Sequence, residues 1–128
     1  MRKLFIMVLI VIFLPAILWA GNTETRGGNF ISLILDGSTD WDTYSSANNN
    51  GLRIRRIEFY PSALNDKVII RQDSVTGVII TQLHCPATPA QSKLREFNCE
   101  KPINVVIEAS ECVLGTPANA LLMIELAE

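Results

Sequence analysis

Few residues of this 128-residue chain could supply catalytic chemistry. The single histidine, His84, is followed directly by Cys85, and a thiol beside an imidazole is the smallest equipment for a cysteine nucleophile. Both fall at the end of a predicted strand, where neighbouring side chains point to opposite faces, so the pair is badly placed to share a proton. The sequence has no glycine-rich phosphate loop and no Ser-His-Asp or paired-carboxylate signature. We therefore predict that the chain is not an enzyme and uses no cofactor.

The three cysteines predict one disulfide and one leftover thiol, because their spacing matches no paired zinc pattern. Cys99 and Cys112 are separated by a predicted strand whose ends lie roughly 23 Å apart, whereas a disulfide tolerates a Cα separation of about 7 Å. Cys85 and Cys99 flank one proline-containing loop, so the favoured bridge is Cys85–Cys99. A Cys85–Cys112 bridge and three free thiols remain open alternatives.

Three carboxylates cluster in a loop that also contains glycine and serine. Asp36, Asp40 and Asp42 offer the several oxygen ligands that calcium prefers. Their spacing departs from that of the EF-hand, and aspartates are common in turns for their own reasons. These residues therefore predict either a calcium site or ordinary turn formation.

Exposed aromatic and basic residues suggest where another protein could bind. Trp41 and Tyr44 lie in a polar loop, and aromatic side chains supply much of the contact area at interfaces. Arg53, Arg55 and Arg56 follow on the next strand and could contact a partner or an anion. The alternatives are that the aromatics fold back over one end of the core and that the arginines form an ordinary solvated strand face.

The first twenty residues have the order of an export signal. Arg2 and Lys3 precede an apolar run from Leu4 to Leu14, then Pro15, and the small residue Ala20 supplies a cleavage position. Residues 4–20 are also long enough to span a membrane if they stay attached, since a span needs about 17–25 residues. We predict a signal peptide or membrane anchor over residues 1–20, and a working domain in the periplasm or outside the cell.

The composition after this segment limits the partners. Residues 21–128 are 108 residues and, because Arg2 and Lys3 lie in the first twenty, they carry 9 basic and 13 acidic residues, a net charge of −4. A mildly acidic domain is a poor binder of nucleic acid, and this length suits one hydrophobic core. We expect a single domain that contacts a protein partner or copies of itself, and a membrane only through residues 4–20.

Short apolar segments separated by turn residues predict an all-β fold. We expect a linker over residues 21–29, then a domain over residues 30–128, with a polar loop or a short irregular strand over 36–51 and a loop with one helical turn near 91–97. A change of phase near Arg55 and Arg56 predicts a β-bulge. The predicted strands span residues 30–35, 52–60, 67–72, 78–83, 103–109 and 120–126. Such a series favours a small antiparallel β-sandwich or a jelly-roll-like domain.

The order of these elements resembles that of small β-rich structural proteins of tailed-phage modules. A basic and apolar strand ending in an aromatic (RIRRIEFYPSA) is followed by KVIIRQDSVTGVII, by EFNCEKPINVV, by a Gly-Thr turn and by ALLMIELA. The resemblance covers residues 52–126 and concerns the order of elements, without a signature motif. It implies a structural role and no catalytic residues. The export segment and the three cysteines depart from it.

These observations together predict a non-enzymatic structural or adhesive module that is exported or associated with a virion and acts through protein contacts. Its candidate contact residues are Trp41, Tyr44, Arg53, Arg55 and Arg56. The alternative is a secreted domain that binds a ligand or calcium through the Asp36–Asp42 loop.

Overall fold

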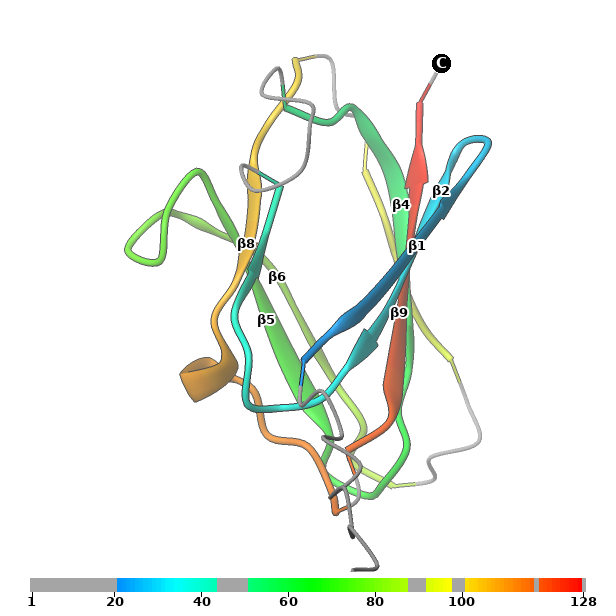
Figure 1. Ribbon diagram of the computed structural model, residues 1–128, viewed down its shortest axis with the longest axis vertical. Helices are drawn as coiled ribbons and strands as arrows, with labels where there is room; N and C mark the ends of the chain where they lie inside the picture. Colours follow the sequence, from blue (N-terminus) through cyan, green and yellow to red (C-terminus); the bar gives the residue numbers. More distant parts are fainter. Residues whose placement is uncertain (1–20, 44–50, 88–91, 98–100, 117, 128) are drawn as a thin grey trace, which may run out of the picture.

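Two antiparallel β-sheets pack face to face in the computed structural model of the chain, which describes residues 21–43, 51–87, 92–97, 101–116 and 118–127. Figure 1 views the sandwich from one side, with β5, β6 and β8 on the left and β1, β2, β4 and β9 on the right. We call the five-stranded sheet, in the order β1-β2-β9-β4-β7, sheet A, and the four-stranded sheet, in the order β3-β8-β5-β6, sheet B.

The elements follow one another with short connections. Sheet A contains β1 (Thr23–Gly27), β2 (Phe30–Leu35), β4 (Ile54–Tyr60), β7 (Lys93–Glu96) and β9 (Ala120–Leu126). Sheet B contains β3 (Trp41–Asp42), β5 (Lys67–Gln72), β6 (Ile79–His84) and β8 (Val105–Ile107), and a single 3-10 turn, η1 (Ala109–Glu111), follows β8. The all-β, two-sheet prediction is confirmed. The described residues include no helix long and apolar enough to span a bilayer.

Several predictions fall outside the described residues. The signal peptide or anchor over residues 1–20 is one of them, and Tyr44 and Cys99 are two others. These remain sequence-based predictions.

Strong apolar patterning placed most strands correctly. The predicted strands over residues 30–35, 67–72 and 120–126 have the bounds of β2, β5 and β9. The predicted bulge is also present, because the register of β4 against β9 shifts between Ile54 and Arg56. The extra residue, Arg55, lets Ile54 and Ile57 both face the core, where each is fully buried.

The linker prediction over residues 21–29 is wrong, since residues 23–27 form β1 and pair along their whole length with β2. Every residue of β1 is exposed, so the strand shows no apolar alternation that could reveal it. Its sequence signals are the β-branched Thr23 and Thr25 and the two-residue turn Gly28-Asn29, in which Gly28 has a φ of +56°.

One further segment differs from expectation, and one agrees with an alternative. Residues 93–96 form the edge strand β7 and no helical turn, because they pair with β4. Within residues 36–51, the alternative of a short strand is correct for Trp41 and Asp42, which form β3 and pair with β8. Short polar strands at sheet edges carry little periodicity, so tertiary pairing decides their conformation.

The core fills the space between the two sheets. Sheet A contributes alternate residues of its three central strands, and sheet B contributes inward residues of β5, β6 and β8. The largest fully buried side chains include Phe59, Ile31, Leu33, Ile57, Ile70 and Ile124. Burying side chains of this kind stabilises the fold by roughly 1.5–3 kcal/mol each.

One buried carboxylate, that of Asp66, fixes a corner of the sandwich. Its Oδ2 accepts hydrogen bonds from the backbone N–H groups of Ser62 (2.6 Å) and Ala63 (2.8 Å), and its Oδ1 accepts one from Gly115 (2.7 Å). Burial acts to raise the pKa of Asp66, but these hydrogen bonds outweigh it and the pKa is lowered. Asp66 thus joins the turn before β5 to the segment that leads into β9.

Candidate functional site

Trp41, predicted as an exposed contact residue, lies in the core instead. Its side chain is 7% exposed, and its Nε1–H donates a hydrogen bond of 2.8 Å to Glu24 Oε2. The alternative weighed from the sequence, that the aromatic folds back over the core, is the correct one for Trp41. The reason is that its neighbour in β8, Ile107, is itself a core residue.

The three arginines lie on the surface, and two of them share one carboxylate as a partner. Arg55 Nη1 lies 3.3 Å from Glu125 Oε1, and the Arg56 guanidinium forms an ion pair with the other oxygen of the same carboxylate. Arg53 is exposed just before the start of β4. The charges of Arg55 and Arg56 are therefore partly offset by Glu125, and a contact of the three arginines with a partner stays a prediction.

The three aspartates do not converge on a common point. Asp36 accepts hydrogen bonds from the backbone N–H groups of Ser38 (3.0 Å) and Thr39 (2.9 Å), and Asp40 caps the backbone N–H of Ala109 at 2.8 Å. Among the described residues no group of three or more histidine, cysteine or acidic side chains could hold a metal ion. The calcium prediction for Asp36, Asp40 and Asp42 therefore lacks the geometry it requires, and Asp36 and Asp40 serve as turn-forming residues.

His84 and Cys85 lie on opposite sides of their segment, as the alternation of a strand requires. His84 is exposed, whereas Cys85 is fully buried. No disulfide joins Cys85 to Cys112, so that alternative pairing is wrong. The Cys85–Cys99 bridge stays a prediction because Cys99 lies outside the described residues.

A pocket of about 480 Å³ opens at one end of the sandwich. It lies between the turn after β2 and the segment before β9, and its lining includes Asp36, Cys112, Leu114 and Thr116. Burial raises the pKa of the Cys112 thiol, which keeps the thiol protonated and weakly nucleophilic at neutral pH. The Asp36 carboxylate is already occupied by its own turn, so the pocket presents no activated nucleophile and no open acid or base.

The outer face of sheet A carries a different feature, a group of apolar side chains on neighbouring strands, with Ser32 and Glu58 between some of them. The strand registers place Ile34 beside Leu121 and Leu121 beside Tyr60, and they place Met123 beside Glu58 and Glu58 beside Leu94. Ile34 is 40% exposed and Leu94 50% exposed. We call this set the apolar face: it consists of Phe30, Ile34, Tyr60, Leu94, Leu121 and Met123.

Charged residues border and cross the apolar face. The row that contains Phe30 continues through Glu125 to Arg56, and the Tyr60 hydroxyl donates a hydrogen bond of 2.9 Å to Glu58 Oε2. Oppositely charged partners therefore offset one another within the face. The exposed apolar atoms of the face remain in contact with water. Burying them against a partner would be favourable by about 25 cal/mol per Å² of apolar area.

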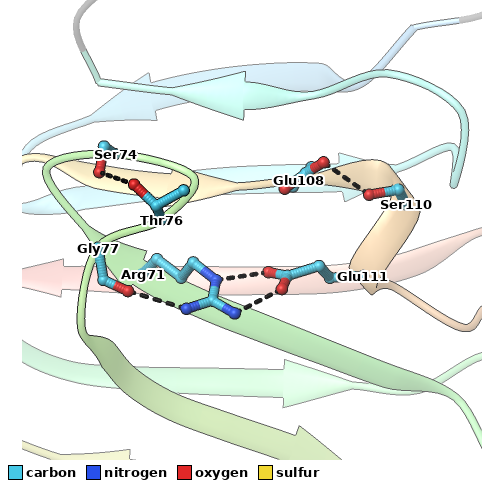
Figure 2. Close-up of polar contacts among 7 residues, drawn as sticks. All are labelled: Arg71, Ser74, Thr76, Gly77, Glu108, Ser110 and Glu111. Carbon is cyan, nitrogen blue, oxygen red and sulfur yellow. Dashed lines mark hydrogen bonds and ion pairs between the residues drawn. The ribbon is translucent and has the colours of Figure 1, made fainter.

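The chain itself covers the outer face of sheet B over β5 and β8, whereas on β6 the outward residues Gln82 and His84 and the apolar Ile79 stay exposed. Arg71 on β5 holds Glu111 of η1 through two hydrogen bonds, from Nε at 2.7 Å and from Nη2 at 2.5 Å, and its Nη1 donates a third to Gly77 O at 2.8 Å (Figure 2). Val106, which faces Arg71 in the neighbouring strand, is only 6% exposed. The 3-10 turn and the β5–β6 turn are thereby fastened over this sheet.

The apolar face was not predicted from the sequence, because in residues 30–35 only Ile31, Leu33 and Leu35 were assigned to an apolar face. Phe30 and Ile34 in β2, and Leu121 and Met123 in β9, make these strands apolar on both faces. That pattern is typical of strands buried on both sides. It is the sequence signal from which the apolar face could have been predicted.

Comparison of the chain with protein-family models, with curated proteins and with solved structures found no match. We therefore infer a function from the geometry of this chain.

Proposed function

We propose that the chain is a non-enzymatic structural or adhesive module that binds a protein through the apolar face of sheet A. The observation that carries the proposal is the group of exposed apolar side chains on β2, β4 and β7 (Phe30, Ile34, Tyr60 and Leu94), with the partly buried Leu121 and Met123 of β9 between β2 and β4. Large apolar patches on soluble domains mark interaction sites, because leaving them in water is unfavourable. The partner chemistry is a protein surface that is itself apolar and flat.

The shape of the apolar face argues for a protein and against a small molecule. A small ligand is usually held in a concave pocket with a few convergent polar groups, whereas the apolar face lies on the outer side of a sheet. Flat sheet faces bury their apolar residues by packing on another sheet or on a helix. The ion pair of Arg56 with Glu125 supplies a polar border of the kind found around interface cores.

The strand order supports the jelly-roll part of the prediction. Apart from β1, the strands follow the order β2-β9-β4-β7 in one sheet and β3-β8-β5-β6 in the other. As a result, β2 and β3 are in different sheets, as are β4 and β5, β6 and β7, and β8 and β9. Double-sheet jelly rolls recur in viral capsid and lectin domains, which agrees with a structural or adhesive role. This support is an analogy between folds, and the apolar face remains the primary argument.

The proposed location is outside the cytoplasm, in the periplasm, on the cell or in a virion. The support is the order of residues 1–20, with a basic start, an apolar run and a small residue at the end.

Photo-cross-linking in the cells that make the protein tests this proposal. A benzophenone amino acid is introduced at Leu94, on the apolar face, and in a second variant at Gln82, which is exposed on the outer side of β6 in sheet B. We expect a discrete cross-linked protein species from position 94 and none from position 82. Absence of a species from position 94, or equal yields from both positions, would contradict the proposal. Circular dichroism of both purified variants checks that they fold.

A further inference from the structure

The edge strand β1 offers a second surface that the proposed function does not use. β1 pairs with β2 on one side and has no strand on its other side among the described residues. All five of its residues are exposed. Figure 1 shows the β1–β2 hairpin, coloured blue to cyan, in front of the strands that follow it in sheet A.

The turn between β1 and β2 determines which backbone groups of β1 face outward. Gly27 and Phe30 flank the two-residue turn and are register partners, and residues in this position form a hydrogen-bonded pair. Such pairs alternate along an antiparallel ladder, so Thr25 is also bonded to β2 while Glu24 and Arg26 direct their N–H and C=O groups to the unpaired edge. The edge thus presents the donors and acceptors of two residues, with Thr25 between them.

The side chains of β1 are complementary to a second copy of themselves in one register. If two β1 strands pair antiparallel with Thr25 opposite Thr25, Glu24 of each copy lies opposite Arg26 of the other. Opposite charges on directly paired residues stabilise a sheet by roughly 0.2–1 kcal/mol for each pair. A shift of the centre to Glu24 or to Arg26 would instead place like charges opposite each other, so the charges select one register.

The existing contacts of Glu24 and Arg26 hold these charges in position for such pairing. Glu24 and Arg26 form an ion pair within the strand, and the second oxygen of Glu24 accepts the hydrogen bond from Trp41. Their side chains remain 27% and 35% exposed. Two copies would bring together four charges of alternating sign.

The other edge of sheet A lacks this property. In β7, a two-fold centre at Leu94 would place Lys93 opposite Arg95, and a centre at Arg95 would place that residue opposite itself. Like charges opposed on adjacent strands are destabilising, and charged edges of this kind protect sheets from unwanted pairing. The two edges therefore differ in their capacity to bind a second copy.

We propose that β1 pairs antiparallel with β1 of a second copy, centred on Thr25, so that two sandwiches share one continuous sheet. Both copies use the same patch, as a two-fold symmetric dimer requires. The inference concerns the edge of sheet A and does not rest on the protein partner proposed for the apolar face.

Disulfide trapping tests the register directly. Thr25 would form a pair without backbone hydrogen bonds, with Cα atoms about 4.5 Å apart, which a disulfide can bridge. We expect the full-length Thr25→Cys variant to form a disulfide dimer under mild oxidation, with peptide mapping placing the bond between the two introduced cysteines. The matched Thr23→Cys variant would lie opposite Gly27 and should give no bond between its introduced cysteines. A Thr25→Cys protein that stays unlinked, or that links no faster than Thr23→Cys, would refute the register.

Charge exchange tests the same dimer without cysteines. We expect Arg26→Glu to weaken the dimer roughly tenfold, as measured by sedimentation velocity over a concentration series, because two attractive pairs become repulsive. Mixing Arg26→Glu with Glu24→Arg should restore association as a heterodimer. Ile34→Thr should leave this dimer unchanged, and combined with the benzophenone amino acid at position 94 it should lower cross-linking from the apolar face, so the two proposals fail independently. A wild-type chain that is monomeric at all concentrations, or an unchanged Arg26→Glu dimer, would overturn the inference. Thermal melts confirm that each variant folds, and Arg26→Glu alone suffices if Glu24→Arg loses stability with its Trp41 contact.

Discussion

The outer faces of the two sheets differ in how far the chain covers their apolar side chains. Over β5 and β8, sheet B is covered by η1 and the β5–β6 turn, which Arg71 fastens, and Val106 is almost inaccessible; β6 leaves Ile79 and Gln82 exposed. Sheet A leaves Ile34 exposed on β2, which is apolar on both faces, and Leu94 exposed on the edge strand β7. The difference indicates that the outer residues of β5 and β8 serve the stability of the chain, whereas the exposed apolar residues of sheet A are available to another molecule.

The largest expected effect concerns the corner that supports sheet B. Asp66→Ala removes the acceptor for the backbone N–H groups of Ser62, Ala63 and Gly115. Because buried donors without partners are costly, we expect the free energy of unfolding to fall by about 3 kcal/mol or more. Urea denaturation measures the change, and Ser74→Ala, at an exposed position in the β5–β6 turn, is the control that should change it little. A loss below about 1 kcal/mol would show that the hydrogen bonds of Asp66 contribute little to the stability of the fold.

Because the pKa of Asp66 is lowered, we also predict that the free energy of unfolding depends on pH. The pKa of Asp66 is lowered in the folded chain, so the unfolded chain takes up this proton first as the pH falls. The contribution is complete above the ordinary carboxyl pKa of about 4 and disappears as the pH falls through the lower folded value. We expect stability below pH 4 to decline more steeply for the wild type than for Asp66→Asn. Parallel profiles from urea melts would contradict this.

A matched pair of substitutions compares the two faces directly. Val106→Thr places a hydroxyl in the covered face of sheet B and should cost about 1–2 kcal/mol. Ile34→Thr, on the apolar face, replaces one β-branched residue by another at an exposed position and should change stability by less than about 0.5 kcal/mol. Equal losses in the two variants would mean that the faces are equally buried in the free chain.

The smallest effect is expected at the fastening of η1. Glu111→Gln weakens the ion pair with Arg71, and it should lower Tm by less than Val106→Thr does, because both side chains remain partly open to solvent. The difference in Tm from the wild type should shrink in 1 M salt, where charges are screened. A difference that persists unchanged in salt would indicate that packing, and not charge, holds the turn.

Sequence patterning predicted the parts of this fold that are buried on one side. β2, β5 and β9 were placed by their apolar residues, and the bulge at Arg55 followed from the phase change between Ile54 and Ile57. β1 and β7 were missed because edge strands made of exposed residues carry no periodic signal. Sequence alone could not show that Trp41 is buried, since its place depends on pairing with β8, more than sixty residues away.

The candidate site depended even more on tertiary structure. The apolar face joins side chains from four strands, and its extent follows from the pairing of β9 between β2 and β4. The apolar residues at both parities of β2 and β9 were visible in the sequence. Which of the two parities faces the core became clear only with the sheet order.

Carbene footprinting tests the contrast between the two faces most directly. A diazirine reagent is photolysed with the protein in the cells that make it and with the purified chain, and labelling is mapped by mass spectrometry. We predict that Phe30, Ile34 and Leu94 are labelled much less in the cells than in the purified chain. Gln82 and Val78, on the sheet B side, should be labelled equally in both samples. Equal labelling of Phe30, Ile34 and Leu94 in the two samples would contradict the claim that the apolar face of sheet A is a protein-binding surface.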